Sequence, residues 1–344
     1  MSQLRLNPMT GRWVTIASER ALRPADFAHH RLPVEADPAR PCPFCPGNEE
    51  ATPPALETYG RDGTWLVRVV PNLYPAFSGS GSFDVTQLGP VFTQAPGAGI
   101  HEVVVLARDH ATSWAGLDDR QSGLVMAAIR DRMEDHARQP AVAYTQMIVN
   151  HGREAGASLE HPHGQLLGIP FVPGELTDEL DGFARHDGCL LCAVAEEESA
   201  ARVRVVAEDD RVQVVAPFWS GVPYEMLLIP RAHEPTLDRA NPADLVAVGR
   251  AVRDALARLE STVPSAPYNV VFHTAPHHHD GPFHWHAHIL PRLTSAAGFE
   301  QGTGVLINIV APEAAAEQLV AARPTACDVD EGDVLRSPAL RSTS

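Results

Sequence analysis

Two segments of this chain carry the same chemically reactive residues in the same order, and this recurrence limits the possible folds more than any other feature. Each segment begins with a Cys-x-x-Cys pair, passes through an apolar stretch that ends in histidine, and closes on histidines separated by one residue. The matching residues are Cys42, Cys45, His110 and His161 in the first segment and Cys189, Cys192, His233 and His286 in the second. His110 and His161 are 51 residues apart, and His233 and His286 are 53 apart. Four elements in one order predict an internal duplication.

Hydrophobic patterning predicts similar secondary structure in both segments. Short apolar stretches rich in β-branched residues are typical of buried strands, and they lie at residues 103–107, 141–149, 226–229 and 269–272. Apolar residues at helical spacing predict helices within 118–138 and 243–260. Each half is therefore expected to be an α+β unit, a mostly antiparallel sheet with a helix packed on it. The expected divisions are 1–180, 181–323 and a polar tail over 324–344.

The charge balance indicates which binding partners are disfavoured, and the cysteine pairs are interpreted according to the cellular compartment. The chain has 27 Lys and Arg against 43 Asp and Glu, a formal charge of −16, which disfavours nucleic acid and anionic membranes as partners. No apolar run approaches the roughly 18 residues of a spanning helix, and the first residues lack the apolar core of a signal peptide. A cytoplasmic location is therefore expected. In a reducing compartment, Cys-x-x-Cys pairs are more often metal ligands or redox dithiols than disulfides.

The segment HPHGQ, at residues 161–165, combines features that suit a reactive site. In an extended chain, His161 and His163 point to the same side, because side chains alternate along a strand. Pro162 stiffens the backbone between them, and Gly164 allows a ligand to approach closely. Two chemistries suit such a pair of imidazoles, which are metal binding and nucleophilic attack on phosphorus.

Six motifs spread over most of the chain give this pattern a specific resemblance. They are RLNPMTGRWVTIASERALRP at 5–24, CPFCPGNE at 42–49, VVPNLYPAF at 69–77, VNHGREAGAS at 149–158, HPHGQ at 161–165 and HWHAHILPR at 284–292. Together they resemble the galactose-1-phosphate uridylyltransferase family of the histidine-triad superfamily. The resemblance implies two histidine-triad-like halves that arose by duplication.

The resemblance also implies a mechanism. The second histidine of the motif, His163, matches the family's nucleophile, which attacks the α-phosphorus of a nucleotide sugar and forms a nucleotidyl-histidine. The other ring nitrogen of His163 is expected to donate to a backbone carbonyl near His161, so that the reactive tautomer is held. Gln165 stands where hydrolases of the superfamily carry a third histidine, and it resembles a ligand of phosphoryl oxygens. This glutamine favours transfer over hydrolysis.

Further site residues follow from the same resemblance. Phosphate and nucleotide contacts match Arg20, Arg23, Asn72, Asn150, Gly156 and Ser158. Candidate contacts to the acceptor, within the segment 297–308, are Phe299, Glu300, Gly302, Gly304 and Asn308. This segment resembles the branch of the family that includes nucleotide-sugar phosphorylases. Leu73 replaces an acidic residue found in many uridylyltransferases, so a preference for uracil is not secured.

The resemblance implies a zinc site in each half. The first ligand set is Cys42, Cys45, His110 and His161, a closed Cys₂His₂ site of the structural kind. The second zinc is expected on Cys189, Cys192, His233 and His286. An iron site made by Glu179, His273, His286 and His288 is the alternative for the second metal. The retained cysteine pair favours zinc, because thiolates select it over hard carboxylate ligation.

The predicted function is transfer of UMP from UDP-glucose to galactose 1-phosphate through the histidine adduct. A nucleotide-sugar phosphorylase, or a transferase acting on adenylyl or other nucleotide sugars, is the alternative. A non-catalytic, zinc-stabilised nucleotide binder is a third hypothesis, disfavoured by the intact His163 and Gln165. The resemblance further implies a homodimer with shared active sites, in which each chain donates the segment 297–308 to its partner.

Overall fold

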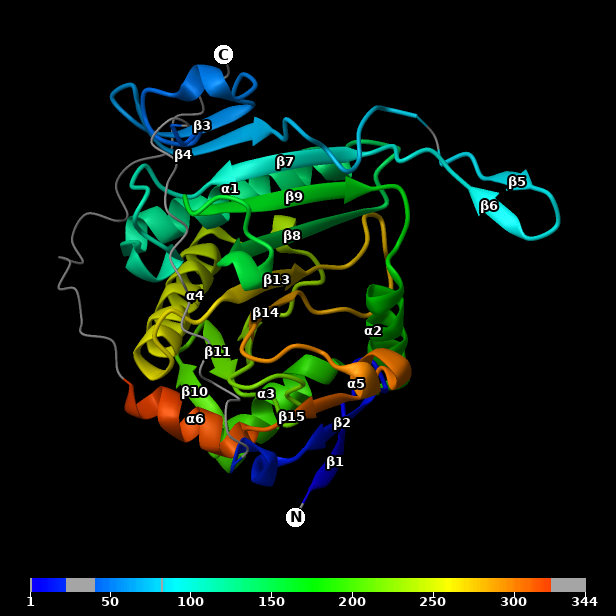
Figure 1. The fold of residues 1–344 in the computed structure, drawn as a ribbon, viewed down its shortest axis with the longest axis vertical. Coiled ribbons are helices and arrows are strands. Elements are labelled where there is room, and N and C mark those ends of the chain that lie inside the picture. Colours follow the sequence, from blue (N-terminus) through cyan, green and yellow to red (C-terminus); the bar gives the residue numbers. More distant parts are fainter. Residues whose placement is uncertain (1, 23–40, 82, 323–344) are drawn as a thin grey trace.

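The computed structural model describes residues 2–22, 41–81 and 83–322, and a sheet of ten strands forms its centre (Figure 1). Across the sheet the order is β10 (Val205–Glu208), β11 (Val212–Val215), β12 (Met226–Pro230), β14 (His286–Pro291), β13 (Tyr268–His273), β8 (Tyr144–His151), β9 (His163–Ile169), β7 (Ile100–Val105), β4 (Thr64–Pro71) and β3 (Glu57–Arg61). Every neighbouring pair in it is antiparallel. The predicted α+β class with a mostly antiparallel sheet is therefore confirmed.

The two halves of the chain share this sheet. β8 from the first half pairs with β13 from the second, with Ile148 opposite Val271. Each half contributes five adjacent antiparallel strands, and the two sets join at β8 and β13 into one sheet, which the sequence did not predict. This pairing satisfies backbone groups that two separate sheets would leave exposed at their edges. The expected boundary at residue 180 falls inside a helix, α2 (Gly174–Arg185). The expected tail over 324–344 lies outside the described residues.

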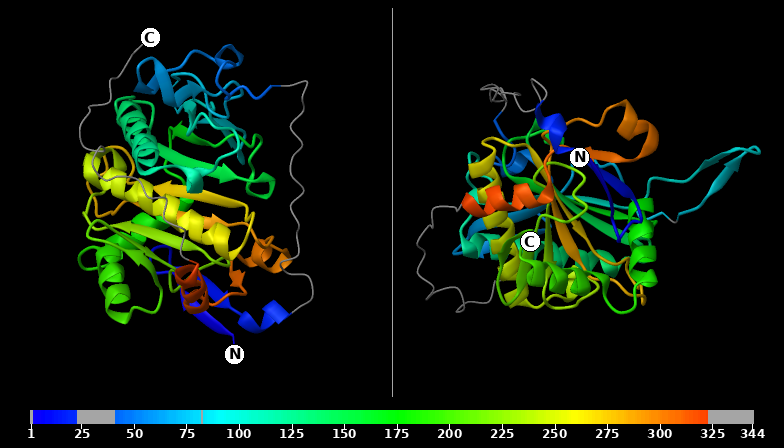
Figure 2. Two further views of the ribbon diagram at one scale, coloured as in Figure 1. Left: turned by 90° about the vertical axis from the view of Figure 1, so that its left-hand side faces the viewer. Right: turned by 90° about the horizontal axis from the view of Figure 1, so that it is seen from below.

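Two long helices, α1 (Asp119–Ala137) and α4 (Pro242–Thr262), cover one face of the sheet (Figure 2). The side chain of Asp118 caps α1 by accepting from the Gln121 N–H, and Asn241 caps α4 in the same way. Apolar residues from both helices and the sheet form the main core, among them Ile129, Met133, Val252, Leu166 and Phe272. The helices cross closely at Gly249, where an added Cβ would lie 2.7 Å from the Ser122 backbone oxygen.

The other face of the sheet carries the candidate site. Helices α2 and α3 (Leu190–Ala201) cover its second-half part, where Phe183 and Leu191 pack with Leu227 and Ile229 of β12. On the first-half part, Phe44 packs on Val70, Val103 and Val105. Because side chains alternate, His163 and Gln165 of β9 lie on this face, while Leu166 packs into the main core on the other.

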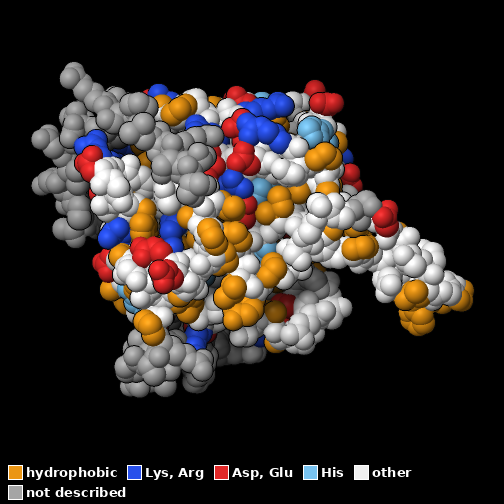
Figure 3. Space-filling model, turned by 90° about the horizontal axis from the view of Figure 1, so that it is seen from above, with side chains coloured by type: hydrophobic (Ala, Val, Ile, Leu, Met, Phe, Trp, Pro, Cys, Tyr) orange, Lys and Arg blue, Asp and Glu red, His pale blue; other side chains and the backbone are white. Residues whose placement is uncertain are grey.

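Smaller elements surround the sheet. β1 (Gln3–Leu6), β2 (Trp13–Ile16) and β15 (Leu306–Asn308) form a three-stranded sheet. The other small elements are the helices α5 (Gly298–Thr303) and α6 (Pro312–Ala321) and the hairpin of β5 (Thr86–Leu88) and β6 (Phe92–Gln94). Short 3-10 helices lie at Ser18–Leu22, Glu49–Ala51, Trp114–Gly116, Arg153–Ala155 and Leu237–Arg239. The hairpin projects from the body as an arm, with hydrophobic side chains at its tip (Figure 3). Within the described residues, no helix is both long and apolar enough to span a membrane.

Candidate active site and metal centres

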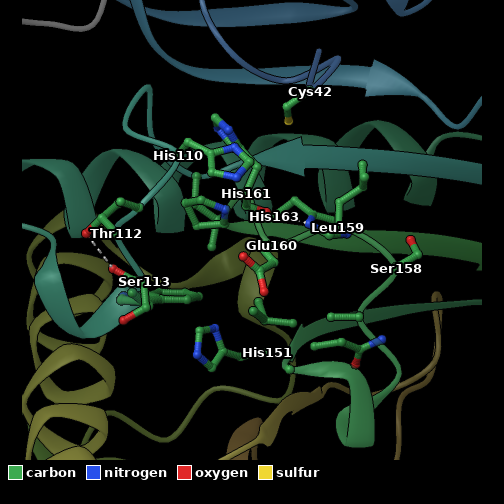
Figure 4. A pocket seen from close by; sticks show the side chains of 18 of the residues that line it. Cys42, His110, Thr112, Ser113, His151, Ser158, Leu159, Glu160, His161 and His163 are labelled. Atoms are coloured by element: carbon green, nitrogen blue, oxygen red, sulfur yellow. Dashed lines mark hydrogen bonds between the residues drawn. The ribbon is translucent and has the colours of Figure 1, made fainter. Parts of the chain in front are cut away.

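His163 is the first residue of β9, and it lines a cavity of about 840 Å³ (Figure 4). Its Nδ1 lies 2.8 Å from the backbone oxygen of His161. A carbonyl oxygen can only accept, so Nδ1 carries the proton and Nε2 keeps its lone pair. Burial lowers the pKa of His163, against the opposing effect of the hydrogen bond to the carbonyl, and so favours the neutral ring. A neutral imidazole with an unprotonated Nε2 can act as a nucleophile.

Gln165 follows on the same face of β9 and contacts a histidine that the sequence did not single out. Its Oε1 lies 2.8 Å from Nε2 of His101 on β7, and Nδ2 of Asn72 lies 3.1 Å from the same nitrogen. The predicted site residues Gln165 and Asn72 are thus brought together around His101. No motif spacing pointed to His101. Its position becomes evident only from the strand register, which places Val103, two residues further along β7, opposite Gln165.

The end of β8 and the loop that joins it to β9 bring three more predicted residues, Asn150, Gly156 and Ser158, to the same region. Asn269 of β13 donates through Nδ2 to Oδ1 of Asn150 at 2.7 Å and to the backbone oxygen of Ala155 at 2.8 Å. Because Oδ1 of Asn150 accepts this bond, its amide hydrogens face away from Asn269. Gly156 has a φ of +88°, a conformation that favours glycine, and Ser158 lines the cavity. Asn269 was predicted only as part of a strand.

The first Cys/His cluster contains the four residues that were predicted. The ligand atoms of Cys42, Cys45, His110 and His161 lie within 4.8 Å of one another. The Nδ1 atoms of His110 and His161 are 3.4 and 3.6 Å from Sγ of Cys45. Tetrahedral zinc, with its usual bond lengths, holds sulfur and nitrogen ligands about 3.6 Å apart, so these residues fit the ion. Nε2 of His161 donates to the Ala107 backbone oxygen at 2.8 Å, which leaves Nδ1 to face a metal.

The second Cys/His cluster corrects the sequence prediction. Its members are Cys189, Cys192, His233 and His284, and not His286. Nδ1 of His284 lies 3.4 Å from Sγ of Cys189 and 3.6 Å from Sγ of Cys192, the same spacing as in the first cluster. The missed signal was in the spacing, since His233 and His284 are 51 residues apart, as are His110 and His161. His284 and His286 both point to this face of the sheet, and only the fold shows which one the cysteines meet.

A third cluster lies beside the second and contains His286. The second Cys/His cluster and the predicted iron site therefore do not share this histidine, and both sets of ligands are present. Glu179 of α2 and His273, His286 and His288 of the sheet place their ligand atoms within 4.8 Å of one another. Glu179 is buried, with its Oε1 2.9 Å from Nδ1 of His273 and its Oε2 3.7 Å from Nε2 of His286. A carboxylate with three imidazoles fits iron and other first-row transition metals.

The remaining predicted residues lie elsewhere. Figure 1 shows β2, β15 and α5 toward the lower end of the molecule, while β9 lies in its upper half. Arg20 lies in the 3-10 helix Ser18–Leu22, which follows β2 in the chain. Phe299, Glu300, Gly302 and Gly304 are not among the residues that line the His163 cavity. Asn308 is fully buried, and its Nδ2 donates to the backbone oxygens of Ser220 and Val222, so its predicted acceptor contact is corrected to a structural role. Arg23 lies outside the described residues.

Comparisons with known proteins show the family to which the chain belongs. Residues 1–173 match the family model of the galactose-1-phosphate uridyl transferase N-terminal domain, and residues 93–331 match a domain of unknown function. The chain is 33% identical to an ADP-glucose phosphorylase of Arabidopsis thaliana over 322 residues, covering 90% of each. It is 29% identical to a galactose-1-phosphate uridylyltransferase of Thermotoga maritima over 334 residues, 93% of this chain and 98% of that one. Among solved structures, an ADP-glucose phosphorylase from Arabidopsis thaliana with bound ADP-glucose superposes with a TM-score of 0.79, at 30% identity over 93% of this chain and 98% of that chain.

Proposed function

Because the chain belongs to the galactose-1-phosphate uridyl transferase family, we propose that it is a nucleotidyltransferase in which His163 carries the nucleotidyl group. The observation that supports this is the His163 ring, whose Nδ1 donates to the His161 carbonyl at 2.8 Å and leaves Nε2 to attack. In the first half-reaction, Nε2 forms a bond to the α-phosphorus of a nucleoside diphosphate sugar. The bond from that phosphorus to the bridging oxygen breaks, and the sugar 1-phosphate leaves with this oxygen.

In the second half-reaction, a phosphate oxygen of the acceptor forms a bond to the same phosphorus. The phosphorus–nitrogen bond breaks, and its electron pair returns to Nε2 of His163. The amide hydrogens of Gln165 and Asn150 are donors for the phosphoryl oxygens as negative charge shifts onto them. No side chain needs to protonate the leaving group, because a sugar phosphate departs as a stable anion.

We propose that the metal clusters do not take part in the reaction but hold in place the segments around His163. Zinc held by Cys42, Cys45, His110 and His161 would supply a fixed link between the CPFC segment and the start of β9. Phe44 of that segment packs 5.3 Å from the His163 ring, measured between ring centroids. His161 in turn offers the carbonyl that holds the His163 tautomer. The second cluster, with Cys189, would tie α3 to β14 in the same way.

Inorganic phosphate is the acceptor that we favour, which makes the activity that of a nucleotide-sugar phosphorylase. Both the comparisons and the sequence support it. The relative at 33% identity is an ADP-glucose phosphorylase, and the solved structure with a TM-score of 0.79 is an ADP-glucose phosphorylase with bound ADP-glucose. The segment 297–308 also resembles that branch, and Leu73 offers no carboxylate where many uridylyltransferases carry one. The donor would then be ADP-glucose.

Transfer of UMP from UDP-glucose to galactose 1-phosphate is the second candidate. It is favoured by the match of residues 1–173 to the galactose-1-phosphate uridyl transferase model and by the Thermotoga maritima relative, which covers nearly the same length. Both candidates use the same covalent step on His163. They differ in the base of the donor and in the group that accepts the nucleotidyl unit.

A crossed assay separates these candidates. The purified protein is incubated with ADP-glucose or UDP-glucose, each combined with inorganic phosphate or galactose 1-phosphate, and the nucleotide products are separated. We expect ADP from ADP-glucose and phosphate to form fastest. A higher kcat/KM for UDP-glucose with galactose 1-phosphate would select the second candidate, and failure of every combination, with no protein labelling, would reject nucleotidyl transfer.

We also propose a homodimer that shares its active sites, because neither Arg20 nor the residues of the acceptor segment line the His163 cavity of the same chain. Light scattering should give twice the 37.1 kDa mass of one chain. A 1:1 mixture of His163→Asn and Arg20→Glu chains, after random reassociation, should recover about a quarter of the wild-type activity, since about half of the dimers are mixed and one of the two sites in each mixed dimer keeps both residues. A monomer with full activity, or mixed dimers without activity, would contradict sharing.

The residue spacing supports a duplication and is consistent with our proposal of one nucleophile per chain. His110, His161, His163 and Gln165 are each followed 123 residues later by His233, His284, His286 and His288. We propose that His286 is the counterpart of His163, since its Nδ1 also lies 2.9 Å from the backbone oxygen of the histidine two residues before it. Its Nε2, however, faces Glu179 in the third cluster. We propose that the second half uses the equivalent ring for metal binding.

A further inference from the structure

The tautomer of His101 can be deduced from its backbone partner. Nδ1 of His101 lies 3.0 Å from the backbone nitrogen of Ala76. A backbone N–H can only donate, so Nδ1 of His101 must accept and cannot carry a proton. The neutral ring therefore carries its proton on Nε2. The tautomer is opposite to that of His163, whose Nδ1 faces a carbonyl.

The His101 tautomer determines which way the Gln165 amide faces. Nε2 of His101 lies 2.8 Å from Oε1 of Gln165 and, being protonated, donates to it. Oε1 is thus directed toward β7, and the amide nitrogen of Gln165 must face the opposite way. Within the described part of the chain, no side chain or backbone group is a hydrogen-bond partner for Nε2 of Gln165, so both of its hydrogens stay available.

Asn72 is affected by the same proton. Its Oδ1 accepts from the Tyr74 N–H at 2.8 Å, which directs Nδ2 toward His101 at 3.1 Å from Nε2. A protonated Nε2 cannot accept from this amide. The 3.1 Å contact is therefore not a hydrogen bond, and His101 does not hold the Asn72 amide.

We infer that His101 is a positioning residue that holds the Gln165 amide with its hydrogens toward the transferred phosphoryl group. This inference rests on the proposed function, because it concerns the group that migrates to His163. Phosphoryl oxygens are acceptors without hydrogens, so they need the NH₂ side of the amide. A rotated Gln165 would present Oε1 to them, and the two oxygens would repel each other as charge develops in the transition state. His101 prevents this rotation by offering a donor where Oε1 lies.

The test compares two substitutions of His101 that differ in one property. His101→Phe keeps a planar ring and removes the donor, whereas His101→Gln can place an amide N–H near the position of the lost Nε2–H. The measured quantities are the single-turnover rate at which donor nucleotide sugar labels His163 and the dissociation constant of that donor. We expect His101→Phe to label about tenfold more slowly with little change in donor affinity, and His101→Gln to recover most of the rate.

A double-mutant cycle shows whether His101 acts through Gln165. In the Gln165→Ala background, His101→Phe should cause almost no further loss, because no amide is left to orient. Equal losses in both backgrounds, or an unchanged labelling rate in His101→Phe, would overturn the inference. Labelling of the wild-type protein distinguishes a failure of the proposed function from a failure of the inference about His101. If it forms no adduct with any donor, the proposed function fails, and if it is labelled, only the role of His101 is at stake.

Discussion

His163→Asn is expected to abolish the covalent adduct. Wild-type protein incubated with the donor alone should release one sugar 1-phosphate per site and retain the nucleotidyl label, which is acid-labile and base-stable as a phosphoramidate. Asparagine offers no lone pair equivalent to Nε2, so label and turnover should be lost together. The rate should fall on the order of 10⁶-fold, as expected when a covalent nucleophile is removed. Labelling followed by mass spectrometry, with initial rates showing ping-pong kinetics in the wild type, checks both statements.

The control for this variant is His286→Asn. His286 has the same Nδ1 contact with a preceding carbonyl, at 2.9 Å, but its Nε2 faces Glu179. The His286→Asn protein should form the adduct on His163 at the wild-type rate. His163→Asn should keep its metal content and melting temperature, because His163 belongs to none of the three clusters. Persistence of the adduct in His163→Asn would disprove the mechanism.

Removing one ligand of the first zinc site is expected to lower the stability of the protein more than it lowers the rate of adduct formation. His161→Asn deletes one of four ligands, and structural zinc contributes folding free energy directly. We expect loss of about one zinc per chain and a fall in melting temperature of roughly 10 °C or more. The adduct should form slowly in the fraction that stays folded, because the His161 backbone carbonyl that orients His163 is still present.

Three substitutions in the second half show which histidine completes the second Cys/His cluster. His284→Asn should lose about one zinc, since Nδ1 of His284 lies 3.4 and 3.6 Å from the two sulfur atoms. His286→Asn and His273→Asn should keep both cysteine-bound zinc ions and weaken only the third cluster. Elemental analysis with denaturation curves measures the result. Zinc loss in His286→Asn with retention in His284→Asn would restore the original assignment of His286.

The residues of the first cluster and the contact between His163 and His161 could be predicted because their relation is local or strongly patterned. His161 and His163 are two residues apart in one extended segment, so they share a face in any strand. The acceptor segment was harder, since its candidates lie on α5 and β15, away from the cavity around His163. Asn308 illustrates the difficulty. Its amide donates hydrogen bonds to the backbone oxygens of Ser220 and Val222, a structural role that a motif match does not reveal.

The sequence by itself determined the family, the kinds of ligand, the nucleophile candidate and the alternation that puts His163 and Gln165 on one face. The tertiary structure decided which distant groups meet. It placed His284 with the cysteines, separated the Glu179 cluster from them, and brought His101 and Asn269 to the amides of Gln165 and Asn150. The physical reason is that side-chain type and spacing follow from the chain, whereas hydrogen-bond direction and metal geometry depend on strand register across β7, β8, β9, β13 and β14. A change of register by one residue would turn these side chains to the other face of the sheet.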